Sequence, residues 1–305
     1  MIALAPLPSG AATRIVYFGT PEVAVAPLRA LHKAGIEIDL VITRPDTRRG
    51  RGSEVTPSPV KQAALEMNLR VALDIEDISG VNRDSLLGVV VAYGKLIPAS
   101  TLAQVPMINL HFSMLPRWRG AAPVERAILA GDRTTGVCVM RVVEGLDTGE
   151  VYRRSDVEIR DTDTAVGLRD RLVHIAIPLL LDVVRNGAGI GAPQVGEPTY
   201  AAKINAKDLE FDWTLSAEQL VRITRIGVGH TTFRGKRLNI HSASAMDKPV
   251  SNAPGRIVEA TAEGIVVATG HGAICLQNVQ PEGKPVLDAL SWSRGARLEP
   301  NERFG

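Results

Sequence analysis

Short apolar runs alternate with amphipathic stretches over residues 14–186. The runs have the length of buried strands and end at Gly, Pro or polar residues, which predicts strands at residues 14–18, 37–42, 87–92, 106–112 and 136–143. Apolar residues at helical spacing between them predict helices at residues 27–33, 59–69, 123–130 and 163–186. Strands that alternate with helices are typical of right-handed crossovers. The chain is therefore predicted to be of the α/β class, with a doubly wound, mostly parallel sheet.

The pattern changes at residues 187–193, where the sequence Gly-Ala-Gly-Ile-Gly-Ala-Pro ends all periodicity. Beyond it, Ser216 and Gln219 form a capping-box pattern that predicts one helix at residues 216–226. Short apolar runs between Gly-containing turns then predict strands at residues 237–240, 255–259, 264–268 and 273–279, the pattern of a small β-barrel. We expect four parts: a flexible extension (1–13), a first domain (14–191), a linker (192–207) and a C-terminal β-barrel domain (208–305).

The composition of the 305 residues is that of an ordinary soluble protein, 45% apolar and 22% charged. A net charge of +2 means that any nucleic acid would have to be bound by local basic patches. The two cysteines, Cys138 and Cys275, lie far apart, and no metal-ligand spacing occurs. Neither a signal-peptide pattern nor a run of about 20 apolar residues is found. We expect a cytoplasmic protein without a membrane partner or a metal.

The strongest candidate for chemistry is the pair Asn109 and His111, two residues apart at the end of a predicted strand. Side chains at this spacing point to the same face of a strand. An amide and an imidazole aimed at one point can hold an oxygen whose negative charge grows during attack on a carbonyl. The spacing alone also fits an Asn and a His that only hydrogen-bond to loop backbone.

Asp147 is the third candidate. It lies in the Gly-containing turn Glu144-Gly145-Leu146-Asp147-Thr148-Gly149, after the predicted strand 136–143. A carboxylate there can orient His111 or pass on a proton. Asp, Thr and Gly are also ordinary turn formers, so the segment by itself leaves both interpretations open.

Several motifs occur in the order that is typical of one enzyme family. They are Phe18-Gly19-Thr20-Pro21-Glu22, Gly50-Arg51-Gly52, Pro57-Ser58-Pro59-Val60-Lys61, Val90-Val91-Ala92-Tyr93-Gly94, Asn109-Leu110-His111, Ser113-Met114-Leu115-Pro116, Pro116-Arg117-Trp118-Arg119-Gly120-Ala121-Ala122-Pro123, Leu146-Asp147-Thr148-Gly149 and Tyr200-Ala201-Ala202-Lys203-Ile204. The chain resembles the folate-dependent formyltransferases from about Arg14 onward, and within them the methionyl-tRNA formyltransferases. The resemblance implies a Rossmann-like formyltransferase domain and an open β-barrel of oligonucleotide-binding type.

The resemblance also implies a reaction. A formyl group would pass from 10-formyltetrahydrofolate to the α-amine of methionine on initiator tRNA, with Asn109, His111 and Asp147 as catalytic residues. The folate pocket would be lined by the end of the predicted strand 87–92 and by the Ser-Met-Leu-Pro turn, that is, by Val91, Ala92, Tyr93, Gly94, Ser113, Met114, Leu115 and Pro116.

Basic residues gather in two places where tRNA could bind. Residues 43–61 form a long aperiodic segment with five basic and two acidic side chains, and residues 234–237 form a second cluster. From composition alone, a solvated, mobile loop is the favoured interpretation of residues 43–61, whereas the second cluster fits a solvated surface and an RNA site equally well. The resemblance matches Arg51 to the central basic residue of the loop that enters the acceptor stem, and we assign tRNA binding to Arg48, Arg49, Arg51, Lys61, Arg234, Lys236 and Arg237. Two departures from the family pattern are Ser53-Glu54 and Gly227-Val228-Gly229-His230-Thr231.

Other functions remain possible at this stage. The catalytic pattern alone does not separate a tRNA formyltransferase from a formyltransferase acting on an amino sugar nucleotide or from a formyltetrahydrofolate hydrolase. A non-catalytic RNA-binding relative is a further alternative. A dinucleotide-dependent oxidoreductase is disfavoured because no Gly-x-Gly-x-x-Gly fingerprint follows the first strand. We expect a monomer.

Overall fold

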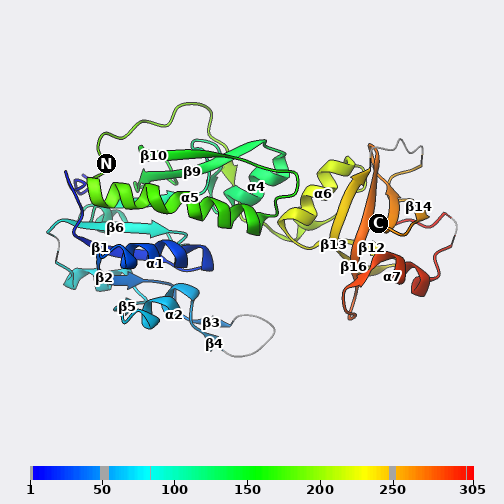
Figure 1. The fold of residues 1–305 in the computed structure, drawn as a ribbon, viewed down its shortest axis with the longest axis horizontal. Helices are drawn as coiled ribbons and strands as arrows, with labels where there is room; N and C mark the ends of the chain where they lie inside the picture. Colours follow the sequence, from blue (N-terminus) through cyan, green and yellow to red (C-terminus); the bar gives the residue numbers. More distant parts are fainter. Residues whose placement is uncertain (1–2, 49–54, 83, 247–251, 300) are drawn as a thin grey trace. The chain divides into compact units, whose positions relative to one another are not determined.

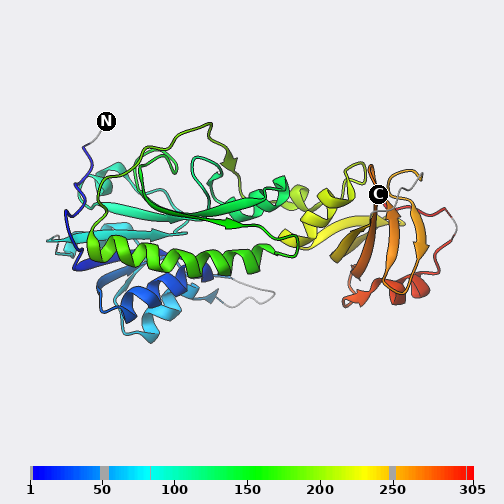
Figure 2. The same ribbon diagram turned by 45° about the horizontal axis from the view of Figure 1, so that its top comes forward.

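The computed structural model describes residues 3–48, 55–82, 84–246, 252–299 and 301–305. The chain forms two compact units (Figures 1 and 2). The first comprises the chain up to Val124 with Thr134–Ile159 and Gly167–Lys203, and the second comprises Glu125–Arg133, Arg160–Val166 and the chain from Ile204 onward.

The first unit is built on one sheet with the strand order β10-β9-β7-β6-β1-β2-β5 in the described part of the chain. Its strands are β1 (Arg14–Gly19), β2 (Glu37–Ile42), β5 (Val71–Ala72), β6 (Leu86–Val91), β7 (Met107–His111), β9 (Thr134–Arg141) and β10 (Val151–Glu158). The five strands from β7 to β5 pair in parallel, whereas β9 and β10 add antiparallel neighbours at one edge. The predicted mostly parallel sheet is confirmed.

α-Helices and short 3-10 helices, labelled η, cover both faces of this sheet. They are η1 (Glu22–Ala24), α1 (Val25–Lys33), α2 (Pro59–Glu66), η2 (Ile75–Gly80), α3 (Ala99–Leu102) and α5 (Ala165–Asn186). The C-terminal end of α5 lies beside the end of α1, where Arg185 donates to the Ala34 carbonyl (Figure 1). On the opposite face, η2 and α3 bury Ile78 and Leu102 in a cluster with alternate residues of β1, β2 and β6. This burial of both faces explains why nearly all residues of the central strands β1 and β6 are apolar.

Two short strand pairings lie outside the two main sheets among the described residues. β3 (Thr47–Arg48) pairs with β4 (Val55–Thr56), and β8 (Arg119–Gly120) pairs in parallel with β11 (Tyr200–Ala201). The second pairing joins segments that are far apart in the sequence. It holds part of the predicted linker against the first unit.

The predicted boundaries at residues 191/192 and 207/208 differ from the limits of the compact units. Residues 192–203 belong to the first unit, because Ala192 pairs with Val151 and β11 pairs with β8. The described part of the predicted N-terminal extension also lies against this unit. Ala5 and Ala12 are buried, and their amides donate to the Leu102 and Val184 carbonyls.

The second unit contains an antiparallel sheet with the order β12-β13-β16-β15-β14, and β17 is paired to β16. Its elements are η3 (Ala206–Leu209), α6 (Ala217–Ile226), β12 (Gly229–Phe233), β13 (Lys236–Met246), β14 (Ile257–Ala260), β15 (Ile265–Ala268), β16 (Ala273–Pro281), β17 (Leu287–Asp288) and α7 (Ala289–Ala296). The capping box of Ser216 and Gln219 is present. Most of the segment 227–231, which departs from the family pattern, lies in β12, since its residues from Gly229 onward pair with β13.

Helix α4 (Pro123–Ala130) contributes to the core of the second unit through Leu129. The two ends of the five-strand path, β12 and β14, are not paired with each other among the described residues, so the barrel is open, as predicted. The core of this unit is rich in aromatic rings. The Phe304 ring contacts the rings of Trp213, Phe233 and Trp292, and Phe233 also contacts Trp292.

Candidate active site

A cavity of about 540 Å³ opens at the carboxyl ends of the parallel strands in the first unit. It is lined by the segments that follow β1, β6 and β7 and by the hairpin loop between β9 and β10. The chain runs from β1 to β2 on one side and from β6 to β7 on the other, so this is the point at which the strand order reverses. Ligands of open α/β sheets bind at such a point.

Asn109 and His111 both line this cavity. They lie at the C-terminal end of strand β7, as the sequence predicts. The Asn109 side-chain Nδ2 donates to Asp147 Oδ1 over 3.4 Å, which is a long hydrogen bond. An amide held so loosely can exchange this partner for a substrate oxygen.

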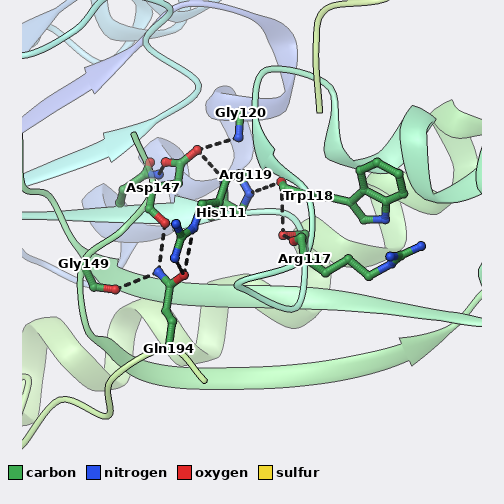
Figure 3. A network of polar contacts seen from close by, with 10 residues as sticks. His111, Arg117, Trp118, Arg119, Gly120, Asp147, Gly149 and Gln194 are labelled. Atoms are coloured by element: carbon green, nitrogen blue, oxygen red, sulfur yellow. Dashed lines mark hydrogen bonds and ion pairs between the residues drawn. The ribbon is translucent and has the colours of Figure 1, made fainter. Parts of the chain in front are cut away.

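The position of the ring protons of His111 follows from its partners (Figure 3). Nε2 lies 2.9 Å from the Trp118 carbonyl oxygen. A carbonyl can only accept, so Nε2 carries a hydrogen and donates it. Nδ1 lies 3.6 Å from Asp147 Oδ2. The Asp147 carboxylate thus lies beside the ring nitrogen that does not bind Trp118. In this position it can orient the His111 ring.

Asp147 is fixed by backbone as well as side-chain contacts. Its Oδ2 accepts from the Gly120 amide over 2.8 Å (Figure 3). Gly120 has φ +116°, and a Cβ at this position would lie 2.9 Å from the Ala201 carbonyl oxygen, so a side chain cannot be accommodated. The structure therefore brings Asn109, His111 and Asp147 together around one cavity.

The residues predicted to bind folate divide into two groups. Ala92, Tyr93 and Gly94 line the cavity, and Thr20 holds this segment by donating to the Tyr93 carbonyl. Val91 is fully buried in β6. The lining formed by the described residues does not include Val91 or the turn Ser113-Met114-Leu115-Pro116.

That turn has structural contacts instead. The Ser113 hydroxyl donates to the Arg117 carbonyl over 2.6 Å. Met114 and Leu115 pack against Cys138 and Met140 of β9. Burial raises the pKa of the Cys138 thiol, so this side chain remains protonated, as expected of an inert cysteine.

The residues predicted to bind tRNA lie in both units. Arg49 and Arg51 fall outside the described residues, and of Arg48 only the backbone is described, at the end of β3. Lys61 makes an ion pair of 2.7 Å with Asp46, at the base of the same loop. Its charge is therefore partly compensated before any RNA binds.

In the second unit, Arg234 donates to Glu302 and to the Ala296 and Arg297 carbonyls. The Glu302 carboxylate raises the pKa of Arg234. Its guanidinium thus ties the β12–β13 turn to the C-terminal segment. Lys236 and Arg237 follow on β13 and are exposed.

Sequence analysis did not assign roles to several residues of this site. Gln194 accepts from Arg119 and donates to the Asp147 and Gly149 carbonyls. Thr199 accepts from the Trp118 amide. The aperiodic Gly- and Pro-containing segment 187–199 offers no pattern that would have identified either residue.

Comparisons with known proteins show which family the chain belongs to. A family model described as "Formyl transferase" matches residues 13–184, and a model described as "Formyl transferase, C-terminal domain" matches residues 203–297. The chain belongs to the formyl transferase family. This confirms the family that the sequence motifs predict.

The similarity of this formyltransferase to individual proteins extends over nearly its full length. It is 40% identical over 312 residues to a methionyl-tRNA formyltransferase from Symbiobacterium thermophilum, with 95% of both chains covered. It is 38% identical over 319 residues to one from Paraburkholderia phymatum, covering 95% of this chain and 97% of that one. Its fold resembles the solved structure of WlaRD, a sugar 3N-formyl transferase (TM-score 0.66, 18% identity), over 90% of this chain and all of that one.

Two further observations concern metals and membranes. Among the residues that the structure describes, no group of three or more His, Cys, Asp or Glu side chains is placed to hold a metal ion. No helix in the described ranges is both long and apolar enough to cross a bilayer.

Proposed function

We propose that this formyltransferase transfers the formyl group of 10-formyltetrahydrofolate to the α-amine of methionyl initiator tRNA. The observation that carries the chemistry is the convergence of Asn109, His111 and Asp147 on one cavity. The choice of acceptor is supported by relatives that are methionyl-tRNA formyltransferases and match both units. We further propose that the protein acts as a monomer in the cytoplasm, where free cysteines persist.

The first task of the site is to stabilise charge on the formyl oxygen. Attack by a neutral amine on the formyl carbon places negative charge on that oxygen. We assign Asn109 Nδ2 and the His111 ring as the groups that face it. By analogy with oxyanion holes, losing one such donor raises the barrier by roughly 3 kcal/mol.

The second task is to move a proton. The attacking amine loses a proton as the new bond forms, and the departing folate nitrogen gains one. The His111–Asp147 pair, 3.6 Å apart, can take up the first proton and deliver the second. Acid–base help of this kind typically accelerates a reaction about 100- to 10,000-fold.

The cavity is suited to a folate derivative. Its volume of about 540 Å³ is in the usual range for a small-molecule site. Val90, Leu110, Phe112 and Met140 supply apolar walls, and the segment Ala92-Tyr93-Gly94 supplies backbone groups that can read a flat heterocycle. For Val91 and the turn 113–116, the proposed role is indirect, since they shape the strand ends that bear the lining residues.

The tRNA would be bound through phosphate contacts. The proposed contacts are Arg48, Arg49, Arg51 and Lys61 in the first unit and Arg234, Lys236 and Arg237 in the second. Because Arg234 is already engaged with Glu302, we expect Lys236 and Arg237 to contribute more of the affinity in this cluster.

The decisive experiment is a formylation assay that compares acceptors. Purified enzyme with 10-formyltetrahydrofolate is offered methionyl initiator tRNA, methionyl elongator tRNA or an amino sugar nucleotide. We expect formylation of the initiator tRNA and little of the other acceptors. Formylation of the sugar nucleotide alone, or release of formate without any acceptor, would instead identify one of the two alternative reactions.

A further inference from the structure

One side chain outside the cavity connects the loops that bear the catalytic groups. Gln194 lies in the segment 188–201, which runs along the first unit and which we call the strap. Figure 3 shows Gln194 below Asp147, Gly149 and Arg119 and in contact with all three. Gln194 is not among the described residues that line the cavity, so it does not reach the reacting groups itself.

The amide of Gln194 is fully used. Its Nε2 donates to the Asp147 carbonyl over 2.8 Å and to the Gly149 carbonyl over 2.9 Å. Its Oε1 accepts from Arg119 Nε over 3.1 Å and from an Arg119 terminal nitrogen over 2.6 Å. Two donors and one oxygen that accepts twice are what a carboxamide offers. A carboxylate of the same length would lack both donors.

These contacts control where the Asp147 carboxylate points. Asp147 has φ +51°, a left-handed conformation that is uncommon for a residue other than glycine. Gln194 binds the carbonyl of this same residue. It also binds Arg119, the neighbour of Gly120, whose amide donates to Asp147 Oδ2. The Asp147 carboxylate is thus positioned in two ways: through the backbone of Asp147, and through the loop that contains Arg119 and Gly120.

The strap holds the other side of the site in the same way. Thr199 Oγ1 accepts from the Trp118 amide over 2.9 Å, and the Trp118 carbonyl accepts from His111 Nε2. The orientation of the His111 ring therefore also depends on the strap. Gln194 differs from Thr199 in acting on Asp147.

We infer that Gln194 is a positioning residue of formyl transfer, which acts by aligning Asp147 with His111 and Asn109. This inference rests on the proposed function. It requires that loss of Gln194 slows the chemical step and leaves both substrates bound. A misplacement of about 1 Å by a change outside the reacting groups can cost on the order of 100-fold in rate.

The first test compares Gln194→Ala and Gln194→Glu with Val195→Ala. Val195 is the next strap residue and its side chain is 84% exposed, so it provides a matched control. We expect kcat to fall about 100-fold in both Gln194 variants, with KM for tRNA and for folate within twofold of wild type. Gln194→Glu retains the side-chain length, so it reports on the lost donors even if the alanine variant folds poorly. An unchanged kcat in Gln194→Glu would overturn the inference.

A double-mutant cycle then tests the route of the effect. In the wild-type background, Gln194→Ala should lower the single-turnover rate about 100-fold. If Gln194 acts through Asp147, the same substitution should lower the rate of the Asp147→Asn variant by less than threefold. Rate losses that multiply would show a general structural role and overturn the inference. Failure of the wild-type enzyme to formylate methionyl initiator tRNA is a separate result, which would reject the proposed function.

Discussion

Three residues around the cavity have a left-handed backbone without being glycine: Ala92 (φ 47°), Trp118 (φ 62°) and Asp147 (φ 51°). Such conformations cost about 1 kcal/mol or more each and tend to gather at functional sites. Each is held by a neighbouring contact. Thr20 binds the Tyr93 carbonyl next to Ala92, Thr199 binds the Trp118 amide, and Gln194 binds the Asp147 carbonyl. At the scale of single residues, the site depends on backbone placement as much as on side-chain chemistry.

The variant Asp147→Asn directly tests the proposed role of Asp147 in proton transfer. Asn tolerates the left-handed conformation and its oxygen can still accept from Gly120, so the fold should be retained. The side-chain amide of the variant, however, cannot accept a proton from His111. We expect kcat to fall about 100- to 10,000-fold, with both KM values little changed.

Steady-state formylation kinetics and the thermal midpoint of the variant provide the measurement. Glu144→Gln in the same loop is the control, since it also removes one carboxylate from the cavity lining. Near-normal turnover by Asp147→Asn would remove the role assigned to this residue.

At the scale of elements, the second unit recruits segments from earlier in the chain. Arg126 of α4 makes a two-pronged ion pair with Asp208 of η3, over 2.7 and 3.0 Å. Arg225 of α6 donates to the Arg160 and Asp163 carbonyls just before α5. These charged contacts fix segments that the hydrophobic pattern alone would place in the first domain.

The Arg126–Asp208 pair predicts a pH-dependent stability. The Arg126 guanidinium lowers the pKa of Asp208 in the folded state. The stabilisation is therefore present above the unfolded pKa of about 3.9 and is lost as the pH falls through the folded pKa. We expect Asp208→Asn to lower the free energy of unfolding by about 1–2 kcal/mol at pH 7.

Urea unfolding at about pH 7 and pH 3 measures this difference, because urea does not screen charges. The difference in the free energy of unfolding between wild type and variant should be smaller at the acid pH. Glu282→Gln, at an exposed position of the same unit, is the control and should change little. An equal loss of stability at both pH values would show that the charge of Asp208 does not contribute.

At the scale of the whole molecule, affinity for tRNA has to come from local charge, since the net charge is only +2. Each phosphate contact releases counterions, so the logarithm of the binding constant falls with the logarithm of the salt concentration. The exposed Lys236 on β13 is the clearest candidate for such a contact among the described residues of the second unit.

Lys236→Ala should therefore weaken tRNA binding and reduce the salt slope by about one unit. The affinity for folate should not change. Filter binding or fluorescence titration at several salt concentrations measures the slope. The exposed Lys33 on α1 is the control, since Lys33→Ala removes the same charge from another surface. A slope equal to that of the wild type would exclude Lys236 from the RNA interface.

Much of the central architecture could be predicted because its residues are buried on both faces. The strands β1, β2, β6 and β7 consist mostly of apolar residues, and their ends are predicted to within one or two residues. Strand β10 was not predicted, because Arg153, Arg154, Ser155 and Asp156 make its sequence polar. It lies at the edge of the sheet, where one ladder of hydrogen bonds is enough to hold a polar strand.

The candidate catalytic residues could be identified from the sequence because their chemistry is recognisable in short motifs. Asn109 and His111 share one strand, so their common direction follows from the period of the β-strand. Asp147 was a candidate because of its Gly-containing turn, and the resemblance to known enzymes favoured it over an ordinary turn residue. Its contact with His111 is a long-range fact that no local pattern contains.

The chain by itself determined the central elements, the two types of fold and the kinds of side chain available for chemistry, because these follow from local periodicity and residue type. Only the tertiary structure decided that the segment 192–203 belongs to the first unit and that its Gln194 clamps the turn of Asp147. The physical reason is that these contacts are hydrogen bonds between backbone groups and distant polar side chains. Such bonds leave no periodic trace in the sequence and exist only once the sheet has brought the loops together.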